Sequence, residues 1–328
     1  MDKTNLFRGY HYPMEEYNKT RQNGGFTQLS LDLSSKCNYR CDWCFNLDLL
    51  GKDSDDLLTL EDKKSLLEQS VELGAKTLVF PGTGEPTLDK DFYSLVDYAN
   101  KMGVTTVVYT NLTGNLDSDK IAHLFESDVS MGIKFDSLNI EHFLRRYQTS
   151  EKAYEKFMKN LHEISRIYRG SDEELPQGTV HRVIANTVLT HENKSELGEL
   201  SRKSEELGFP MFVRPVKPLT WAKDNPDTWI NLGNSSGEYA PDRELVELAR
   251  EHNSLFSPSS TLENHCAIYS FGLTVKNNGD IQICPDHHDS RGAFGNVKEV
   301  SLKDVMAKMN SQRKIVPGYC VMLPDIQH

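Results

Sequence analysis

Three cysteines lie close together near the start of the chain, in the stretch Cys37-Asn38-Tyr39-Arg40-Cys41-Asp42-Trp43-Cys44. Their Cys-x3-Cys-x2-Cys spacing lets three thiolates wrap one face of a compact soft-metal centre. A set of three leaves one coordination position without a local ligand, and a small molecule can bind the metal there. The alternative for this stretch is a zinc knuckle that takes its fourth ligand from a distant part of the chain.

Composition limits the class of protein. The chain has 328 residues, enough for one large α/β domain with a small appendage or for two domains. The formal charge of −11 disfavours a nucleic-acid partner, since such binding needs a basic face. No apolar run has the length of a signal peptide or of a membrane span. We therefore expect a soluble, cytoplasmic protein that contacts no membrane.

The remaining cysteines, Cys266, Cys284 and Cys320, form a second group late in the chain. Thiols stay reduced inside cells, so metal ligation is favoured over structural disulfides. Buried core thiols are the alternative for Cys266 and Cys284, because free cysteine is among the most buried residue types.

The elements that position the first cysteines follow from hydrophobic periodicity. Residues 27–33 alternate between apolar and polar and predict a strand directly before the cysteine loop. Thr59 can cap a helix that begins three residues before Asp62 and ends at Gly74. Further strands are expected at 76–80, 105–110, 129–135, 180–189 and 211–213, and further helices near 92–102, 121–125, 150–169 and 197–207.

Six strand–helix units in succession indicate parallel strands joined by right-handed crossovers. This order predicts an α/β fold, a partial (β/α)6 barrel, whose chemistry gathers at the carboxyl ends of the strands. The cysteine loop, residues 81–86, Thr110-Asn111, Asp136-Ser137 and Arg214-Pro215 all fall at that end. Residues 1–26 are expected to cover one end of the sheet.

With these features in place, residues 27–215 resemble the radical S-adenosylmethionine (SAM) superfamily. In that family the three cysteines hold a [4Fe–4S] cluster, and SAM chelates the fourth iron. The resemblance implies that Cys37, Cys41 and Cys44 are the cluster ligands.

The resemblance also implies residues that contact SAM. The glycine-rich loop after the second strand approaches the methionyl amine, which here implies Thr83, Gly84 and Glu85. A side chain at Gly84 would block that approach, so its replacement is expected to weaken SAM binding without disturbing the cluster. The other implied contacts lie at strand ends: Asn111, Lys134, Asp136, Ser137, Asn186 and Arg214. Asn186 is the first candidate among these, because a buried asparagine in an apolar run needs a partner that a ligand can supply.

The C-terminal part resembles the auxiliary-cluster module called twitch, or its longer relative SPASM. Residues 273–275 and 281–284 flank Asn277-Asn278-Gly279-Asp280, a strong hairpin signal, and Ser301 caps a helix. The resemblance implies a second cluster on Cys266, Cys284 and Cys320. The usual terminal cysteine pair is missing, which leaves a histidine (His265, His287 or His288), a substrate atom or water as the fourth ligand.

The expected domains are an N-terminal extension (1–26), the barrel (27–215), a linker or lid with a helix (216–260) and a β-hairpin/helix auxiliary-cluster module (261–328). The resemblance implies an oxidoreductase or epimerase that removes a hydrogen atom from a small polar, sugar-like metabolite or a peptide. It also implies an electron donor such as flavodoxin or ferredoxin. The alternatives are a radical SAM enzyme for tRNA modification or cofactor maturation, and a zinc-binding structural protein. No catalytic residue is identified.

The cysteine spacing yields a direct test. Replacing Cys37, Cys41 or Cys44 with alanine is expected to abolish SAM cleavage, because two thiolates cannot hold the site-differentiated cluster. The measurement is 5′-deoxyadenosine formed by anaerobically reconstituted protein. Robust formation in the triple variant would rule out this role for the cysteines.

Overall fold

A computed structural model describes residues 4–44, 46–53, 56–176, 178–190, 192–215, 248, 251–252, 272–282 and 294–312. The predicted ligands Cys266, Cys284 and Cys320, the nearby histidines and most of the expected linker lie outside these residues. Within the described ranges, no helix combines the length and apolar character that crossing a bilayer requires.

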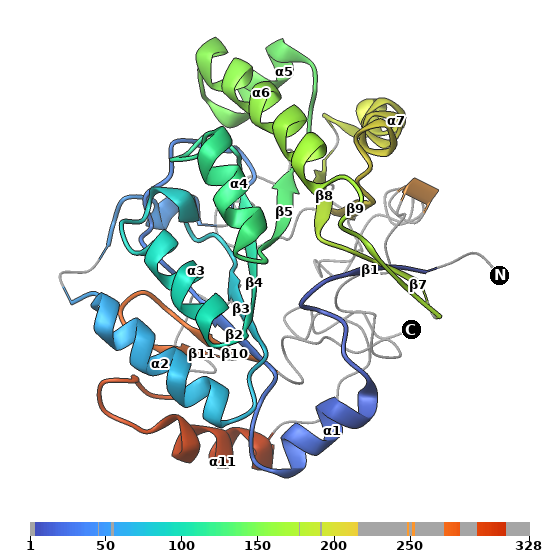
Figure 1. Ribbon diagram of the computed structural model, residues 1–328. Helices are drawn as coiled ribbons and strands as arrows, with labels where there is room; N and C mark the ends of the chain where they lie inside the picture. The colour runs from blue at the N-terminus through green and yellow to red at the C-terminus, as the bar shows by residue number, and fades with distance from the viewer. Residues whose placement is uncertain are drawn as a thin grey trace, which may run out of the picture.

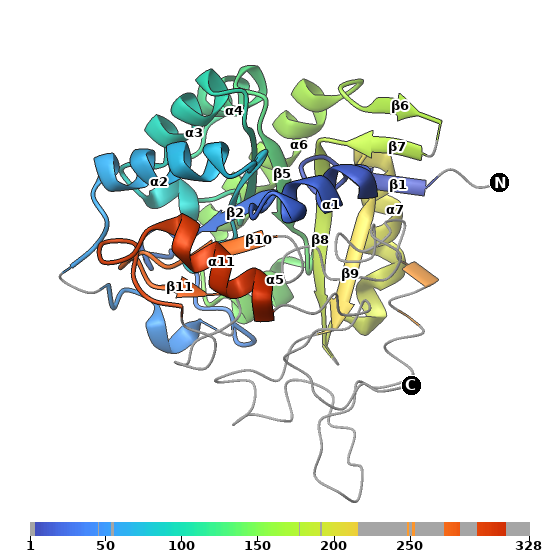
Figure 2. The same ribbon diagram turned by 90° about the horizontal axis from the view of Figure 1, so that it is seen from below.

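The central element is a sheet of eight strands in the order β11-β10-β2-β3-β4-β5-β8-β9 (Figures 1 and 2). From β10 to β9 all neighbours run parallel, and only β10 and β11 are antiparallel. The strands are β2 Gln28–Leu31, β3 Thr77–Phe80, β4 Thr105–Thr110, β5 Ser130–Lys134, β8 Val183–Leu189, β9 Met211–Pro215, β10 Gly272–Val275 and β11 Ile281–Gln282. Sequential parallel strands confirm the predicted partial-barrel topology.

Helices lie along the outer face of this sheet (Figure 1). The connecting helices are α2 Leu60–Glu72, α3 Phe92–Lys101, α4 Ser118–Glu126, α5 Ile140–Tyr147, α6 Glu151–Tyr168 and α7 Leu197–Leu207, with short 3₁₀ turns at Leu47–Leu49, Pro86–Leu88 and Lys194–Glu196. The predicted cap of α2 is confirmed, because Thr59 and Asp62 form a reciprocal capping box. Outward-facing strand residues such as Leu78 and Phe80 are completely buried in the main hydrophobic core.

The N-terminal extension fills the barrel at the amino ends of its strands. Phe7 of β1 (Thr4–Phe7) and Tyr10 form a separate apolar cluster with the inward-facing Val79, Val107 and Ile184. The turn after β1 then bonds to the first residue of β3, where the Thr77 hydroxyl donates to the Gly9 carbonyl. The expectation that residues 1–26 cover one end of the sheet therefore agrees with the structure. The helix α1 (Met14–Gln22) follows.

Two local predictions need correction. The strand expected at 180–189 is divided at Arg182: β7 (Gly178–His181) pairs with β1 and β6 (Glu173–Leu175) in a small second sheet, and only β8 enters the barrel. The second is α5, which the sequence analysis does not predict. Its apolar residues Ile140, Phe143, Leu144 and Tyr147 recur at helical spacing, but this signal spans only two turns. Phe143 and Tyr147 are buried, and so is Arg146.

The predicted C-terminal hairpin is present as β10 and β11, and the predicted helix is α11 (Leu302–Gln312). The hairpin does not stand apart from the barrel, because β10 pairs in parallel with β2 over its whole length. Lys276, just after β10, also forms an ion pair with buried Asp32 at 3.0 Å. The described part of the C-terminal segment thus extends the barrel sheet beside the strand that leads into the cysteine loop.

A buried ion pair between α2 and the start of α3 allows a stability test. Lys63 Nζ lies 2.7 Å from Asp91 Oδ2, and both side chains are almost fully buried. Lys63→Met is expected to lower the free energy of unfolding by about 3 kcal/mol, because it leaves a buried carboxylate without its main partner. Urea unfolding measures this change. The control Lys64→Met removes a neighbouring pair with exposed Glu61 and should cost less than about 0.5 kcal/mol; equal losses would contradict the prediction.

Candidate metal centre

The three early cysteines lie on the loop that leaves β2 at the carboxyl end of the sheet. All three are free thiols; Cys41 is buried, and Cys37 and Cys44 are half-buried. The Cys37 sulfur accepts a hydrogen bond from the Tyr39 backbone N–H at 3.5 Å, and the Asn111 amide lies 4.0 Å away. The Cys37 thiol therefore lies next to Asn111, at the carboxyl end of β4.

Burial controls the protonation of these thiols. It raises the pKa of Cys37 to about 11 and raises the pKa of Cys41 and Cys44 above the ordinary value. The positive charge of Lys134 acts against this shift at all three sulfurs. Metal binding here must displace protons from neutral thiols, so it depends on pH.

The donor chemistry fits an iron–sulfur cluster. In the described part of the chain, no group of three or more histidine, cysteine, aspartate or glutamate side chains could hold a metal ion as it stands. A four-iron cluster has a different requirement from a single ion, because its thiolates bind separate irons. Three free thiols on one loop, with mutual electrostatic interactions, match that donor set.

The glycine-rich loop after β3 packs directly against the cysteine loop. The Glu85 backbone N–H donates to the Lys36 carbonyl at 2.8 Å. A Cβ on Gly84 would lie 2.3 Å from that same carbonyl oxygen, far inside van der Waals contact. Gly84 is thus required for this contact with the residue before Cys37, and a side chain there would also displace the backbone next to the first thiol, an effect that the sequence analysis did not consider.

The Glu85 carboxylate joins this loop to β4. It is almost completely buried and accepts hydrogen bonds from the Thr87 hydroxyl (2.7 Å), the Thr110 hydroxyl (2.7 Å) and the Asn111 N–H (2.8 Å). Burial raises the pKa of Glu85, and these hydrogen bonds pull it back. Its side chain is therefore engaged within the protein. Thr83, in contrast, is half-exposed and lines a small recess with Leu33 and Ser34.

The loop after β4 holds the other side of the cysteine loop. The Asn111 amide donates to Asn38 Oδ1 at 2.9 Å, and the Asn38 amide donates to the Thr113 hydroxyl at 2.8 Å. The side-chain oxygen Oδ1 of Asn111 accepts from the Thr113 N–H at 2.9 Å. Asn111 was expected to contact SAM, and in this structure its side chain connects the two loops.

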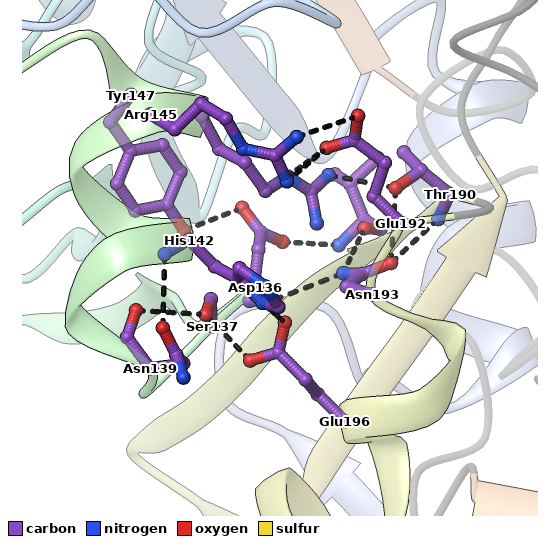
Figure 3. Close-up of polar contacts among 12 residues, drawn as sticks. Asp136, Ser137, Asn139, His142, Arg145, Tyr147, Thr190, Glu192, Asn193 and Glu196 are labelled. Carbon is purple, nitrogen blue, oxygen red and sulfur yellow. Dashed lines mark hydrogen bonds and ion pairs between the residues drawn. The ribbon is translucent and has the colours of Figure 1, made fainter.

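The predicted residues at the end of β5 belong to a buried polar network (Figure 3). Asp136 is fully buried and accepts from Lys134 Nζ at 2.8 Å, from the Tyr147 hydroxyl at 3.1 Å and from the Val188 N–H. The Ser137 hydroxyl donates to Glu196 Oε2 at 2.6 Å, and the other oxygen of Glu196 contacts the His142 ring. The structure brings Lys134, Asp136 and Ser137 together, with partners from α5 and the loop after β8.

Asn193 completes this network, although the sequence analysis did not identify it. Its amide donates to the carbonyls of Asp136 and Val188, both at 3.0 Å, and its oxygen accepts from the Thr190 N–H at 2.8 Å (Figure 3). It thereby joins the carboxyl ends of β5 and β8. An asparagine between Thr190 and the 3₁₀ turn was the available signal, since asparagine commonly bonds nearby backbone.

Asn186 differs from the other predicted contacts. It is buried in β8, in register with Lys134 of β5, and its side-chain oxygen has no hydrogen-bond partner among the described residues. A buried polar atom without a partner is costly unless a ligand or water supplies one. Arg214 lies in β9 opposite Val188.

The helix α5, which the sequence analysis did not predict, packs against the cysteine motif. Its last two carbonyls accept hydrogen bonds from the motif: Arg146 from the Asp42 N–H at 3.2 Å, and Tyr147 from the Arg40 N–H at 2.9 Å. The Tyr39 ring stacks on Tyr147 with centroids 5.0 Å apart. The free carbonyls that end a helix thus fix the backbone between the cysteines.

Contact between the glycine loop and the cysteine loop yields a test. Gly84→Val is expected to lower the iron content of anaerobically reconstituted protein, because its side chain displaces the Lys36 backbone next to Cys37. Gly198→Ala is the matched control, since a Cβ there meets no atom within 4 Å. Iron analysis of both variants gives the answer; wild-type iron in Gly84→Val would show that the loops can separate without cost to the cluster.

Comparisons with known proteins agree with this geometry. A GTP 3',8-cyclase of Staphylococcus haemolyticus is 34% identical over 79 residues, which are 23% of this chain and 23% of that protein. An S-adenosylmethionine-dependent nucleotide dehydratase of Selenomonas ruminantium is 25% identical over 170 residues, 52% of this chain and 58% of the relative. The chain therefore spans less than two thirds of the length of each of these relatives.

Among solved structures, Streptococcus suis SuiB bound to its precursor peptide SuiA has a TM-score of 0.64 and 17% sequence identity, over 89% of this chain and 68% of SuiB. At this identity the likeness concerns the fold. The family model described as the Radical SAM superfamily matches residues 31–202, more than half of the chain and including all three early cysteines. The chain belongs to the radical SAM superfamily.

Proposed function

We propose that this protein cleaves SAM and uses the resulting 5′-deoxyadenosyl radical to remove a hydrogen atom from a small polar metabolite or a peptide. The observation that carries the proposal is the loop with three free thiols at the carboxyl end of a parallel sheet, held there by the loops after β3 and β4. A [4Fe–4S] cluster on Cys37, Cys41 and Cys44 would supply the electron that cleaves SAM.

The chain's own residues position and shield these reactants. Among the predicted SAM contacts, the unpaired oxygen of Asn186 is best placed to accept a hydrogen bond from a ligand. Thr83 borders the recess beside the cysteine loop, and Gly84 lets the two loops approach. Glu85, Asn111, Asp136 and Ser137 have protein partners, so we assign their side chains to holding the strand ends in place; Lys134 and Arg214 remain proposed contacts at the neighbouring strand ends.

The inner face of the sheet supports the proposed substrate class. Lys134 and Asn186 lie side by side there, and the ion pair of Asp32 and Lys276 lies where β2 and β10 end. Such a surface suits a polar substrate, such as a sugar-like metabolite or a peptide. SuiB, a structural neighbour, has been crystallised with its precursor peptide. The proposed outcome is oxidation or epimerisation of that substrate.

A nucleotide is the second candidate substrate. The sequence relatives named above are a GTP 3',8-cyclase and a nucleotide dehydratase. This observation favours a small nucleotide, as in a cofactor-maturation enzyme, over tRNA, which the net charge of −11 disfavours.

Incubation with isotopically labelled compounds tests the function. Reconstituted protein with SAM and dithionite should form methionine and 5′-deoxyadenosine, as measured by mass spectrometry. Deuterated sugars, peptides and nucleotides are then supplied, and the true substrate class transfers deuterium into 5′-deoxyadenosine. Failure to form any 5′-deoxyadenosine from protein with a full cluster would refute the proposal.

We also propose that Cys266, Cys284 and Cys320 form a second, twitch-like cluster site in the segment 261–328, separated from the barrel by the segment 216–260. It would accept an electron from the substrate in a net oxidation. A cytoplasmic one-electron donor, such as flavodoxin or ferredoxin, would reduce the first cluster. The hairpin β10–β11 supports this arrangement, because it carries the chain that leads to Cys284 alongside β2.

Iron counting tests the second cluster. Wild-type protein is expected to bind about eight irons, as two four-iron centres, and a Cys266→Ala, Cys284→Ala double variant about four. The double variant should still form 5′-deoxyadenosine, because the first site is built from other residues, yet it should fail to oxidise substrate. About four irons in the wild type, with a single cluster in Mössbauer spectra, would instead make the late cysteines core thiols or hydrogen-atom donors.

A further inference from the structure

The side chain of Arg146, in the last turn of α5, is a buried cation with few partners. It is 1% exposed and donates one hydrogen bond, from Nη2 to the Thr190 hydroxyl at 2.8 Å. Its Nε and Nη1 groups have no hydrogen-bond partner among the described residues. Glu192 is 3.9 Å from Nε and is also bound by the more exposed Arg145. The Asp42 carboxylate also attracts the guanidinium, since Arg146 acts to lower the pKa of Asp42. Neither acidic group is within hydrogen-bond distance of Arg146 among the described residues, so this buried charge needs a further interaction.

That interaction is a stack on the residue before the third cysteine. The guanidinium carbon of Arg146 lies 4.0 Å from the centre of the Trp43 ring system, and Trp43 is 4% exposed. Lys134 Nζ contacts the same indole at 4.6 Å. Cation–π attraction strengthens when both groups are removed from water, as they are here. Trp43 is therefore in contact with cations from both α5 and β5, and Cys44 follows it in the chain.

The backbone of the same helix turn holds the neighbouring residue. The Arg146 carbonyl accepts the Asp42 N–H at 3.2 Å, so a single residue binds the motif through its main chain and its side chain. Asp42 and Trp43 are the two residues between Cys41 and Cys44. Displacement of Arg146 would release this two-residue bridge, which sets the separation of the second and third thiols.

We propose that Arg146 is a positioning residue for the cluster: its cation–π contact with Trp43 and its backbone hydrogen bond to Asp42 fix Cys44 for cluster binding. The effect of Arg146 on the cluster rests on the proposed function. The positioning of Cys44 does not, because it is a property of the protein without metal. Outer-shell residues of this kind orient metal ligands and tune the metal.

The experiment compares Arg146→Met, which keeps the length and loses the charge, with Arg146→Lys, which keeps the charge and loses the flat stack. Arg145→Met is the matched control, because its side chain is exposed and pairs only with Glu192 in the described structure. In reconstituted protein, Arg146→Met should lose iron to a chelator about tenfold faster than wild type. Arg146→Lys should also lose iron faster than wild type, because an ammonium group cannot reproduce the guanidinium contact with Trp43.

Apo protein provides the readout that does not depend on a cluster. Alkylation of Cys44, measured by peptide mass spectrometry relative to Cys37 in the same molecule, should accelerate in Arg146→Met while Arg145→Met resembles wild type. Trp43→Leu with Arg146 intact should cause the same acceleration, which covers the case in which Arg146→Met fails to fold. Unchanged Cys44 alkylation in the folded variants would overturn the inference. Absence of a cluster in the wild type would defeat the proposed function and leave the alkylation result to decide the positioning of Cys44.

Discussion

The arrangement of this site depends on the buried carboxylate of Glu85. A carboxylate removed from water is stable only when donors surround it, and here they come from Thr87, Thr110 and Asn111. The backbone N–H of the same residue donates to Lys36, directly before Cys37. One residue thus fixes the end of β3, the end of β4 and the start of the cysteine motif. A loop with three thiols needs this restraint, because free thiols on a mobile loop would have no fixed spacing for a metal.

Restraint from the opposite side comes from α5. Its C-terminal carbonyls are satisfied by N–H groups of the motif, and its aromatic and cationic side chains pack against Tyr39 and Trp43. The helix is in turn anchored through Tyr147 to Asp136, which Asn193 connects to β8. The cysteine loop is therefore held between two polar networks, one from β3 and β4 and one from β5 and β8. Each network is centred on a buried carboxylate, Glu85 in one and Asp136 in the other.

The outer and inner faces of the sheet carry different kinds of residue. The outer face is apolar and packs against the connecting helices, whereas the inner face is apolar only at its amino end, where Phe7 and Tyr10 fill it. Toward the carboxyl end, the inner face carries Lys134, Asn186 and the ion pair of Asp32 and Lys276. The N-terminal segment thus closes the end where no chemistry is expected. Polar groups remain at the end where the cysteine loop lies.

Local patterns in the sequence determined the class of fold and the early cysteine motif. The three cysteines lie within eight residues, and the Thr59 cap acts over three positions. Strand and helix periods likewise depend on neighbouring residues, so all of these features can be predicted from the sequence. The shared location of the loops after these strands could also be predicted, because parallel strands all end on the same side of the sheet. Residues such as Asn186 could be singled out because a lone amide in an apolar run is locally unusual.

Only the tertiary structure decided what the polar residues at those ends contact. Gly84 contacts Lys36, which is 48 positions away in the chain, and Glu85 binds Asn111, which is 26 positions away. Arg146 and Trp43 are about 100 positions apart. A local sequence pattern cannot predict contacts over such separations. The same holds for β10, which lies beside β2 although about 240 positions of chain separate the two strands. For α5 the apolar spacing is present in the sequence, and only its contacts with the cysteine loop required the structure. Burial and hydrogen-bond satisfaction act in three dimensions. They gave the side chains of Glu85, Asn111, Asp136 and Ser137 partners within the protein and left Asn186 with an unpaired oxygen.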